Sequence, residues 1–121
     1  MDEPIQSYQD LIAWQKAFRL GVIVHELAGT LPENERFGLI AQLRRAAIEA
    51  ASSIARGYGA GNTRDYVWFL KSARGELYKL DTQLLFALEF KYVTQERYDA
   101  VKPALDESER VLAGLIRSLG G

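Results

Sequence analysis

Apolar residues recur every three or four positions in four stretches of the chain, which is the spacing of amphipathic α-helices. The stretches cover residues 7–28, 32–56, 62–91 and 94–119. Short polar or glycine-rich segments separate them, and short connections make consecutive long helices antiparallel neighbours. The pattern predicts an all-α fold, an antiparallel up-down-up-down four-helix bundle, with residues 1–121 forming a single domain.

Capping residues predict where three of these helices begin. Ser7 is followed three positions later by Asp10, which resembles a capping box with an acid at the third position. Asn62 or Thr63 is a suitable N-cap for the third helix, and Thr94 precedes the fourth.

Proline, glycine and acidic residues predict the remaining boundaries. Pro32 opens the second helix, where Glu33 and Glu35 suit the positive end of the helix dipole. Gly57 is expected to be the left-handed residue just beyond the end of that helix. Pro103 lies inside the fourth helical pattern, so a kink or break is expected about one turn before it.

The third stretch has the most regular core pattern, a heptad seam sustained for three repeats. Its members are Tyr66, Leu70, Ala73, Leu77, Leu80, Leu84 and Ala87. The apolar stripe of the first helix is expected to run through Leu11, Trp14, Phe18 and Gly21 or Val22.

A second stripe of the third helix faces away from this seam. At 100° per residue, Trp68, Gly75, Lys79 and Phe86 share the opposite face. Large aromatic side chains that point away from their own core require another partner, and a glycine lets a second backbone approach closely. The stripe is interpreted as an oligomer interface; in the alternative interpretation the third helix is central and Trp68 belongs to the core.

Composition argues against most catalytic chemistry. The 121 residues contain no cysteine and a single histidine, His25, so no thiolate or multi-histidine metal site can be assembled. No nucleophile–base pair stands out, and no catalytic residue, metal or cofactor is expected. The absence of a signal peptide, of a membrane-spanning apolar run and of cysteine leads us to expect a cytoplasmic protein without a membrane association.

The charges are distributed unevenly, although the formal net charge is only −1. Residues 36–79 carry a net charge of +5, between flanking stretches of −4 and −2. This basic middle is either a contact region for a polyanion or the ordinary alternation of charge on helix surfaces. The candidate nucleic-acid-binding residues are Arg44, Arg45, Arg56, Arg64, Lys71 and Arg74. The glycine-rich residues 57–61 are interpreted as an inter-helix turn, because no strand precedes them and no nucleotide-binding motif follows.

Several motifs together resemble the four helix bundle protein family, whose founding members are encoded in intervening sequences of bacterial 23S rRNA genes. The matching segments are residues 11–17 (LIAWQKA), 31–39 (LPENERFGL), 42–47 (QLRRAA), 53–59 (SIARGYG), 69–75 (FLKSARG) and 80–84 (LDTQL). The family usually has a glutamate where this chain has Arg56 and a serine where it has Glu76, so no role of that glutamate is carried over.

The resemblance implies a bundle that assembles into a ring, a homopentamer, with no known catalysis and a link to RNA. A related branch serves as accessory subunit of retroelement reverse transcriptases. We therefore expect a non-enzymatic homo-oligomer whose partners are copies of itself and RNA or another nucleic acid. The alternative is an assembly or adaptor protein whose ring presents grooves to a protein partner.

Overall fold

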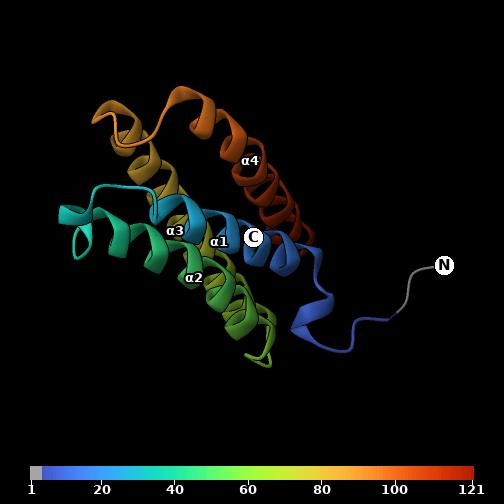
Figure 1. Cartoon of the computed structure of the whole chain (residues 1–121). Helices are drawn as coiled ribbons and strands as arrows, with labels where there is room; N and C mark the ends of the chain where they lie inside the picture. Colours follow the sequence, from blue (N-terminus) through green and yellow to red (C-terminus); the bar gives the residue numbers. More distant parts are fainter. Residues whose placement is uncertain (1–3) are drawn as a thin grey trace.

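The computed structural model describes residues 4–121, and this part of the chain is all-helical. The four long helices are α1 (Ile12–Ala28), α2 (Leu39–Tyr58), α3 (Thr63–Glu89) and α4 (Gln95–Ser118). Two short 3₁₀ helices, η1 (Tyr8–Asp10) and η2 (Glu33–Glu35), precede α1 and α2. The long helices lie alongside one another as a bundle (Figure 1), which confirms the predicted fold class.

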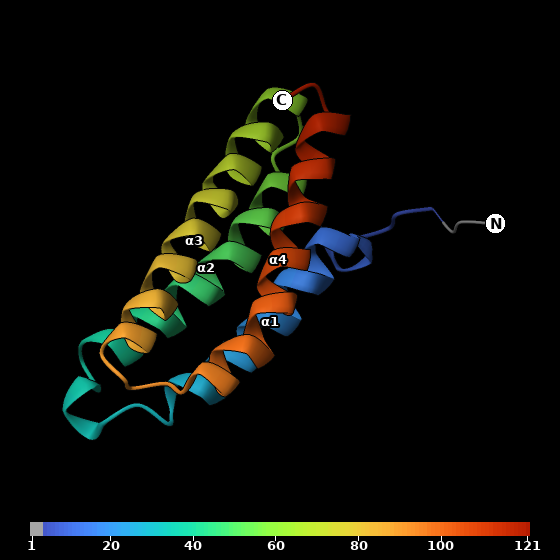
Figure 2. The same cartoon turned by 90° about the horizontal axis from the view of Figure 1, so that it is seen from above.

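The antiparallel arrangement gives the bundle two distinct ends. At one end the α2–α3 connection lies beside the C-terminal turn of α4 (Figure 2). At the other end lie η2 and the connection from α3 to α4. Each helix packs against its two neighbours in the order α1, α2, α3, α4, and α4 closes the bundle against α1.

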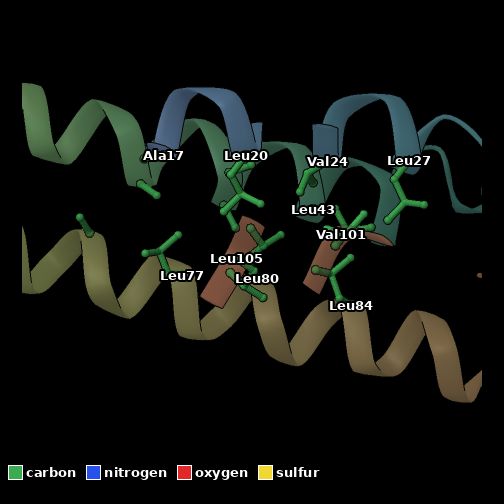
Figure 3. Packing of buried hydrophobic residues seen from close by; sticks show 14 of the residues in the cluster. Ala17, Leu20, Val24, Leu27, Leu43, Leu77, Leu80, Leu84, Val101 and Leu105 are labelled. Carbon is green, nitrogen blue, oxygen red and sulfur yellow. The ribbon is translucent and has the colours of Figure 1, made fainter. Parts of the chain in front are cut away.

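Leucines, valines and alanines from all four long helices fill the space between them. Leu20 of α1, Leu43 of α2, Leu80 of α3 and Leu105 of α4 point toward one another in this core (Figure 3) and are at most 1% exposed. The heptad seam of α3 is buried as predicted from Leu70 to Ala87, and only its first member, Tyr66, is half-buried.

The predicted apolar stripe of α1 is wrong in its phase. The core positions of this helix are Ala13, Ala17, Leu20, Val24 and Leu27. Phe18 and Val22 are instead 43% and 50% exposed. The small alanines take the inner positions because the neighbouring helices come close there, and the bulkier side chains are displaced to the flank.

The first helix also begins later than predicted. Ser7 and Asp10 do form the expected capping box, but it caps the short η1. Leu11 is then extended, and α1 starts at Ile12. This extended residue places the Leu11 side chain in the core and lets the ring of Tyr8 pack on Trp14, with the ring centres 5.2 Å apart.

The second helix begins at Leu39 and not at Pro32. The chain makes only the short η2 after Pro32, and the non-helical backbone of Gly38 separates it from α2. Glu35 then caps α2 by accepting a hydrogen bond from the backbone N–H of Leu39 at 3.1 Å. A carboxylate at this position satisfies an otherwise free N–H and favours the positive end of the helix.

Gly57 does not have the expected left-handed conformation, because α2 continues through Tyr58. The left-handed residue of this connection is Gly61, with φ +87°. Gly57 is needed for a different reason. A Cβ atom there would lie 3.0 Å from the Cβ of Phe69 and 3.1 Å from the carbonyl oxygen of Tyr66, so glycine permits the close approach of α2 and α3.

The ends of α3 and α4 differ in their agreement with the sequence pattern. Asn62 caps α3 and Thr94 caps α4 through their side-chain oxygens, as predicted. α3 ends at Glu89, two residues early, because Lys91 is left-handed at φ 64°. α4 continues without a break through Pro103, because the proline lies on the exposed side, where water can satisfy the carbonyl group one turn earlier.

Candidate interaction surfaces

Among residues 4–121, no group of three His, Cys, Asp or Glu residues is placed to hold a metal ion. His25 is exposed on α1. No helix in the described range has both the length and the hydrophobicity needed to cross a bilayer.

The most densely charged contact between helices joins α3 to α4. Lys102 of α4 forms ion pairs with Asp81 of α3 at 3.5 Å and with Asp106 at 2.9 Å. The hydrogen bond to Asp106 raises the pKa of Lys102. Burial, reinforced by the charge of Asp81, raises the pKa of the Glu109 carboxyl group in the next turn of α4. The ion pair between Lys102 and Asp81 therefore links the two helices, whereas Glu109 and Asp81 repel each other across the same contact.

The outward face of α3 is a row of large, unpartnered hydrophobic side chains. We define the α3 ridge as Trp68, Tyr78, Leu85 and Phe86, which are 64%, 56%, 48% and 50% exposed. The exposure of Trp68 excludes the alternative interpretation in which it belongs to the core of this chain.

The other two residues of the predicted interface also lie on the ridge. A Cβ atom at Gly75 would meet nothing within 4 Å, so the backbone is accessible there. Lys79 is exposed and forms an ion pair with Glu76 at 3.2 Å. The structure therefore brings Trp68, Gly75, Lys79 and Phe86 together on one accessible face, while their role as an oligomer interface stays a prediction.

A second apolar surface lies between α1 and α2. It is a groove of about 560 Å³. Small residues of both helices form its floor, namely Ala17, Gly21, Ala47, Ala51 and Ala55. Its walls carry Trp14 and three exposed side chains, Phe18, Val22 and Ile48. We call this surface the α1–α2 groove.

Sequence reasoning did not find this groove. The available signal was the four-residue spacing of small residues on both helices, Ala17 with Gly21 and Ala47 with Ala51 and Ala55. Such residues fill little space, so two helices that meet through them leave a depression beside the contact. Which helices meet in this way is a tertiary property.

The six candidate nucleic-acid-binding residues do not form one patch. Arg44 is partly buried, and its Nη2 donates to the carbonyl oxygen of His25 at 3.1 Å, so it joins α2 to the C-terminal end of α1. Arg45 is exposed close to that same end of the bundle. Arg74 is half-buried farther along α3.

The other three candidates lie toward the opposite end, around the α2–α3 connection. Arg56 is in the last turn of α2, with its guanidinium 4.7 Å from the ring centre of Phe69. Arg64 is in the first turn of α3, and Lys71 lies two turns farther on. All three are exposed, and none forms an ion pair with another described residue.

The fold adds two basic residues that the sequence analysis missed. The C-terminal end of α4 lies beside the start of α3 (Figure 2) and carries Arg110 and Arg117 on its exposed side. We define the basic end as Arg56, Arg64, Lys71, Arg110 and Arg117. The acidic residues near them in sequence include Asp65, next to Arg64, and Glu107 and Glu109, close to Arg110, so these acids partly offset the basic charge of this end.

The opposite end of the bundle has the reverse balance. Residues 26–38 and 89–99 contain Glu26, Glu33, Glu35, Glu89, Glu96 and Asp99 against Arg36, Lys91 and Arg97. These segments are therefore acidic, although Arg45 is exposed close to them, and their gathering at one end depends on the antiparallel packing of the four helices.

Comparison with known proteins agrees with this fold. The model of the 23S rRNA-intervening sequence protein family matches residues 9–114. A crystal structure of a protein of unknown function from the S23 ribosomal protein family of Bacteroides thetaiotaomicron superposes with a TM-score of 0.81. The two chains are 20% identical, and the alignment covers 88% of this chain and 96% of the other. No curated protein sequence matches the chain significantly.

Proposed function

The chain belongs to the 23S rRNA-intervening sequence protein family, and from this premise we propose that it is a non-catalytic subunit that assembles into a homo-oligomeric ring and binds RNA or another nucleic acid through its basic end. A homopentamer is the ring size that the family resemblance implies. The proposed location is the cytoplasm, where RNA is accessible.

The observation that carries the nucleic-acid part is the gathering, at one end of the bundle, of exposed basic side chains that form no ion pair with another described residue. Arg64 and Lys71 lie in the first turns of α3 and Arg117 lies in the last turn of α4, and these two helix ends meet at one end of the bundle because the helices are antiparallel (Figure 2). Phosphates are bound mainly through such basic side chains, and each contact releases condensed counterions. Arg56 stacks on Phe69, which keeps its guanidinium at the surface.

Assembly into a ring would present several copies of the basic end to the same polyanion. The net charge of one chain is only −1, so a single subunit lacks the strong positive field of most nucleic-acid-binding domains. If the helices run roughly along the ring axis, every basic end faces the same side and every acidic end the other. Several modest patches on one polyanion then bind with an effective concentration that a monomer cannot reach.

The test compares two double variants with the same change in charge. Arg64→Glu/Arg117→Glu reverses two exposed residues of the basic end, and Lys91→Glu/Arg97→Glu reverses two exposed residues at the opposite end. Binding to a fluorescently labelled structured RNA is measured by anisotropy across a salt series. Arg44 is left intact because its hydrogen bond supports the packing of α1.

We expect the affinity of the wild type to fall steeply with salt, with a slope of about −0.9 per neutralised phosphate of a duplex. The basic-end variant should bind at least about tenfold more weakly, with a slope smaller by about 2 because two phosphate contacts are lost. The opposite-end variant should change affinity only through the longer-range field. Equal losses in both variants, salt-insensitive binding, or no binding at about 50 mM salt would each contradict the proposal.

A second candidate function is that of an assembly or adaptor protein. It is favoured by the α1–α2 groove, an apolar depression of about 560 Å³ that a helix of another protein could fill. Purification of tagged protein with and without nuclease separates the two functions. A defined protein partner that survives nuclease treatment, combined with no RNA binding at low salt, would favour the adaptor.

A further inference from the structure

The chain presents one convex and one concave apolar surface, and neither is covered within the described part of the bundle. Trp68, Tyr78, Leu85 and Phe86 project from a single helix. The α1–α2 groove is recessed and has a floor of alanine and glycine. These surfaces belong to different helices, because the ridge lies on α3 and the groove lies between its neighbour α2 and the more distant α1.

We propose that the α3 ridge of one copy packs into the α1–α2 groove of a second copy, head to tail. This inference rests on the self-association in the proposed function and identifies the two surfaces that perform it. It adds the groove, with Phe18, Val22 and Ile48, as the acceptor of the ridge.

The ridge projects from the bundle and the groove is recessed, so the first could enter the second. Trp68 and Phe86 are 18 residues apart on one helix, so the ridge is about 27 Å long at 1.5 Å per residue. The small floor residues let an incoming helix approach to a normal interaxial distance of about 8–10 Å. Gly75 in the middle of the ridge, with open space around it, removes a side chain where the two backbones would come closest.

The ridge is a large exposed apolar patch for a single chain. Monomeric proteins rarely expose contiguous apolar patches of more than a few hundred Å². Four half-exposed large residues on the ridge, together with Phe90 just beyond it at 53% exposure, represent a patch of that size or more. A standard specific interface buries about 800 Å² per partner, and such a patch would supply the apolar centre of an interface of that kind.

Charge favours ridge-to-groove packing over ridge-to-ridge packing. Lys71 lies beside the ridge and forms no ion pair with another described residue, whereas Lys79 is paired with Glu76, so two ridges packed together would bring two uncompensated lysines into the contact. The groove lining contains one formally charged residue, Glu26. Ridge-to-ridge packing would also set bulky side chains against bulky side chains and leave the groove empty in both copies.

A contact between two different surfaces determines how many copies can assemble. An interface between two different surfaces leaves each pair with one free ridge and one free groove, so further copies add until the ring closes. A ridge-to-ridge interface would stop at a dimer. Head-to-tail packing is therefore the form of contact that a ring of this chain requires.

A mixing experiment tests the inference directly. The ridge variant is Trp68→Glu/Phe86→Glu and the groove variant is Val22→Glu/Ile48→Glu. All four positions are at least half exposed in the single chain, so each variant should fold, which circular dichroism checks. Sedimentation velocity at tens of micromolar is run on the wild type, on each variant alone and on an equimolar mixture of the two variants.

We expect the wild type to form a closed oligomer and each variant alone to be a monomer. The mixture should form a 1:1 heterodimer and nothing larger, because one intact groove meets one intact ridge. A control variant, Ile12→Glu/Phe37→Glu, changes two residues that are 61% and 86% exposed but lie outside both surfaces, and it should assemble like the wild type.

Three outcomes would overturn the inference. They are a groove variant that still self-associates like the wild type, a pair of folded variants that do not combine, and a wild type that is monomeric. The first two leave the proposed function standing with a different interface, and the third removes self-association itself. RNA binding is a separate readout, because the basic-end variant keeps both apolar surfaces and should still assemble.

Discussion

The inner and outer faces of α3 are equally hydrophobic at several positions, yet they meet different surroundings. Leu77 is fully buried in the bundle, whereas its neighbour in sequence, Tyr78, is 56% exposed. Leu84 is 4% exposed and the adjacent Leu85 is 48% exposed. The inner face finds its partners on the other three helices, and the outer face finds none within the described chain.

The two faces of α3 contribute to different processes, the inner face to folding and the outer face to association. The inner face stabilises the monomer by removing apolar surface from water. The outer face contributes little to the folded monomer, and any benefit from burying it must come from another molecule. Substitutions on the two faces should therefore affect different measurements.

The largest expected effect comes from truncating a matched pair across the two faces. Leu77→Ala should lower the free energy of unfolding by about 2–5 kcal/mol, because it leaves a cavity in a packed core. Tyr78→Ala should change the stability of the monomer by less than about 0.5 kcal/mol and weaken self-association instead. Urea unfolding at several protein concentrations measures both, since oligomer formation makes the apparent stability concentration-dependent.

A loss of unfolding free energy in Tyr78→Ala as large as that in Leu77→Ala would contradict the separate roles of the two faces. Equal losses at the lowest protein concentration would mean that the outer face contributes to the folding of the single chain. Phe37→Ala provides a reference for a fully solvated aromatic residue, because Phe37 is 86% exposed.

Replacing a glycine by alanine should have opposite effects on stability at the inner and outer contacts of α3. Gly57→Ala should destabilise the chain by about 1–2 kcal/mol, because the added Cβ would lie 3.0 Å from the Cβ of Phe69 at the α2–α3 contact. Gly75→Ala should stabilise the monomer by about 0.5–1 kcal/mol, because a Cβ there meets nothing and alanine favours the helix. Thermal unfolding of both variants gives the two signs.

The head-to-tail interface adds a second readout to this pair. If the partner backbone passes close to Gly75, the alanine that stabilises the monomer should also weaken assembly in sedimentation. Destabilisation of the dilute monomer by Gly75→Ala would show that the outer face is more constrained than its open surroundings indicate.

The smallest expected effect lies at the border of the two faces, where α3 meets α4. Burial first, and then the neighbouring Asp81 carboxylate, raise the pKa of Glu109 above its ordinary value of 4.5. At a pH between the ordinary pKa and the raised native pKa, the native state binds more protons than the unfolded state. The ionisation of Glu109 therefore lowers the free energy of unfolding as the pH rises from the ordinary pKa to the native pKa. Glu109→Gln should abolish that decline and gain less than about 1 kcal/mol at neutral pH, because solvent screens the partly exposed charge.

Glu107→Gln is the control with the opposite sign. The hydrogen bond from Lys16 lowers the pKa of Glu107, so its stabilising effect is present at neutral pH and is lost as the pH falls through the native pKa. Unfolding curves between pH 3 and 8 compare the two variants, the window being set by the ordinary carboxyl pKa of about 4–4.5. The same pH dependence in both variants would contradict the assignment.

The sequence predicted α3 well because both of its faces follow from local geometry. A helix turns about 100° per residue, so the buried seam and the exposed ridge can be placed from spacing alone. The N-caps Asn62 and Thr94 were predictable for a similar reason, since a cap depends on residues within one turn.

α1 shows where that reasoning fails. Trp14 and Phe18 were placed on the predicted apolar stripe, but the core positions are taken by Ala13 and Ala17. Hydrophobicity orders residues by what burial would gain, whereas the space available is set by the distance to the neighbouring helices. That distance is not a local property of α1.

The candidate binding residues divide in the same way. Arg44 and Arg45 are adjacent to each other in sequence, but only Arg44 reaches across to α1, 19 residues earlier in the chain. Arg110 and Arg117 were overlooked because they are about 40 residues or more from the other members of the basic end.

By itself the sequence determined the number and type of the long helices, the N-caps of α3 and α4, the inner seam of α3 and the unpartnered face opposite it. These features depend on residues within a few turns of each other. The tertiary structure alone decided which residues of α1 are buried, where the α1–α2 groove lies and which basic side chains share an end. Those features depend on the distance and direction between helices, which are set by packing of the whole core and have no counterpart in local spacing.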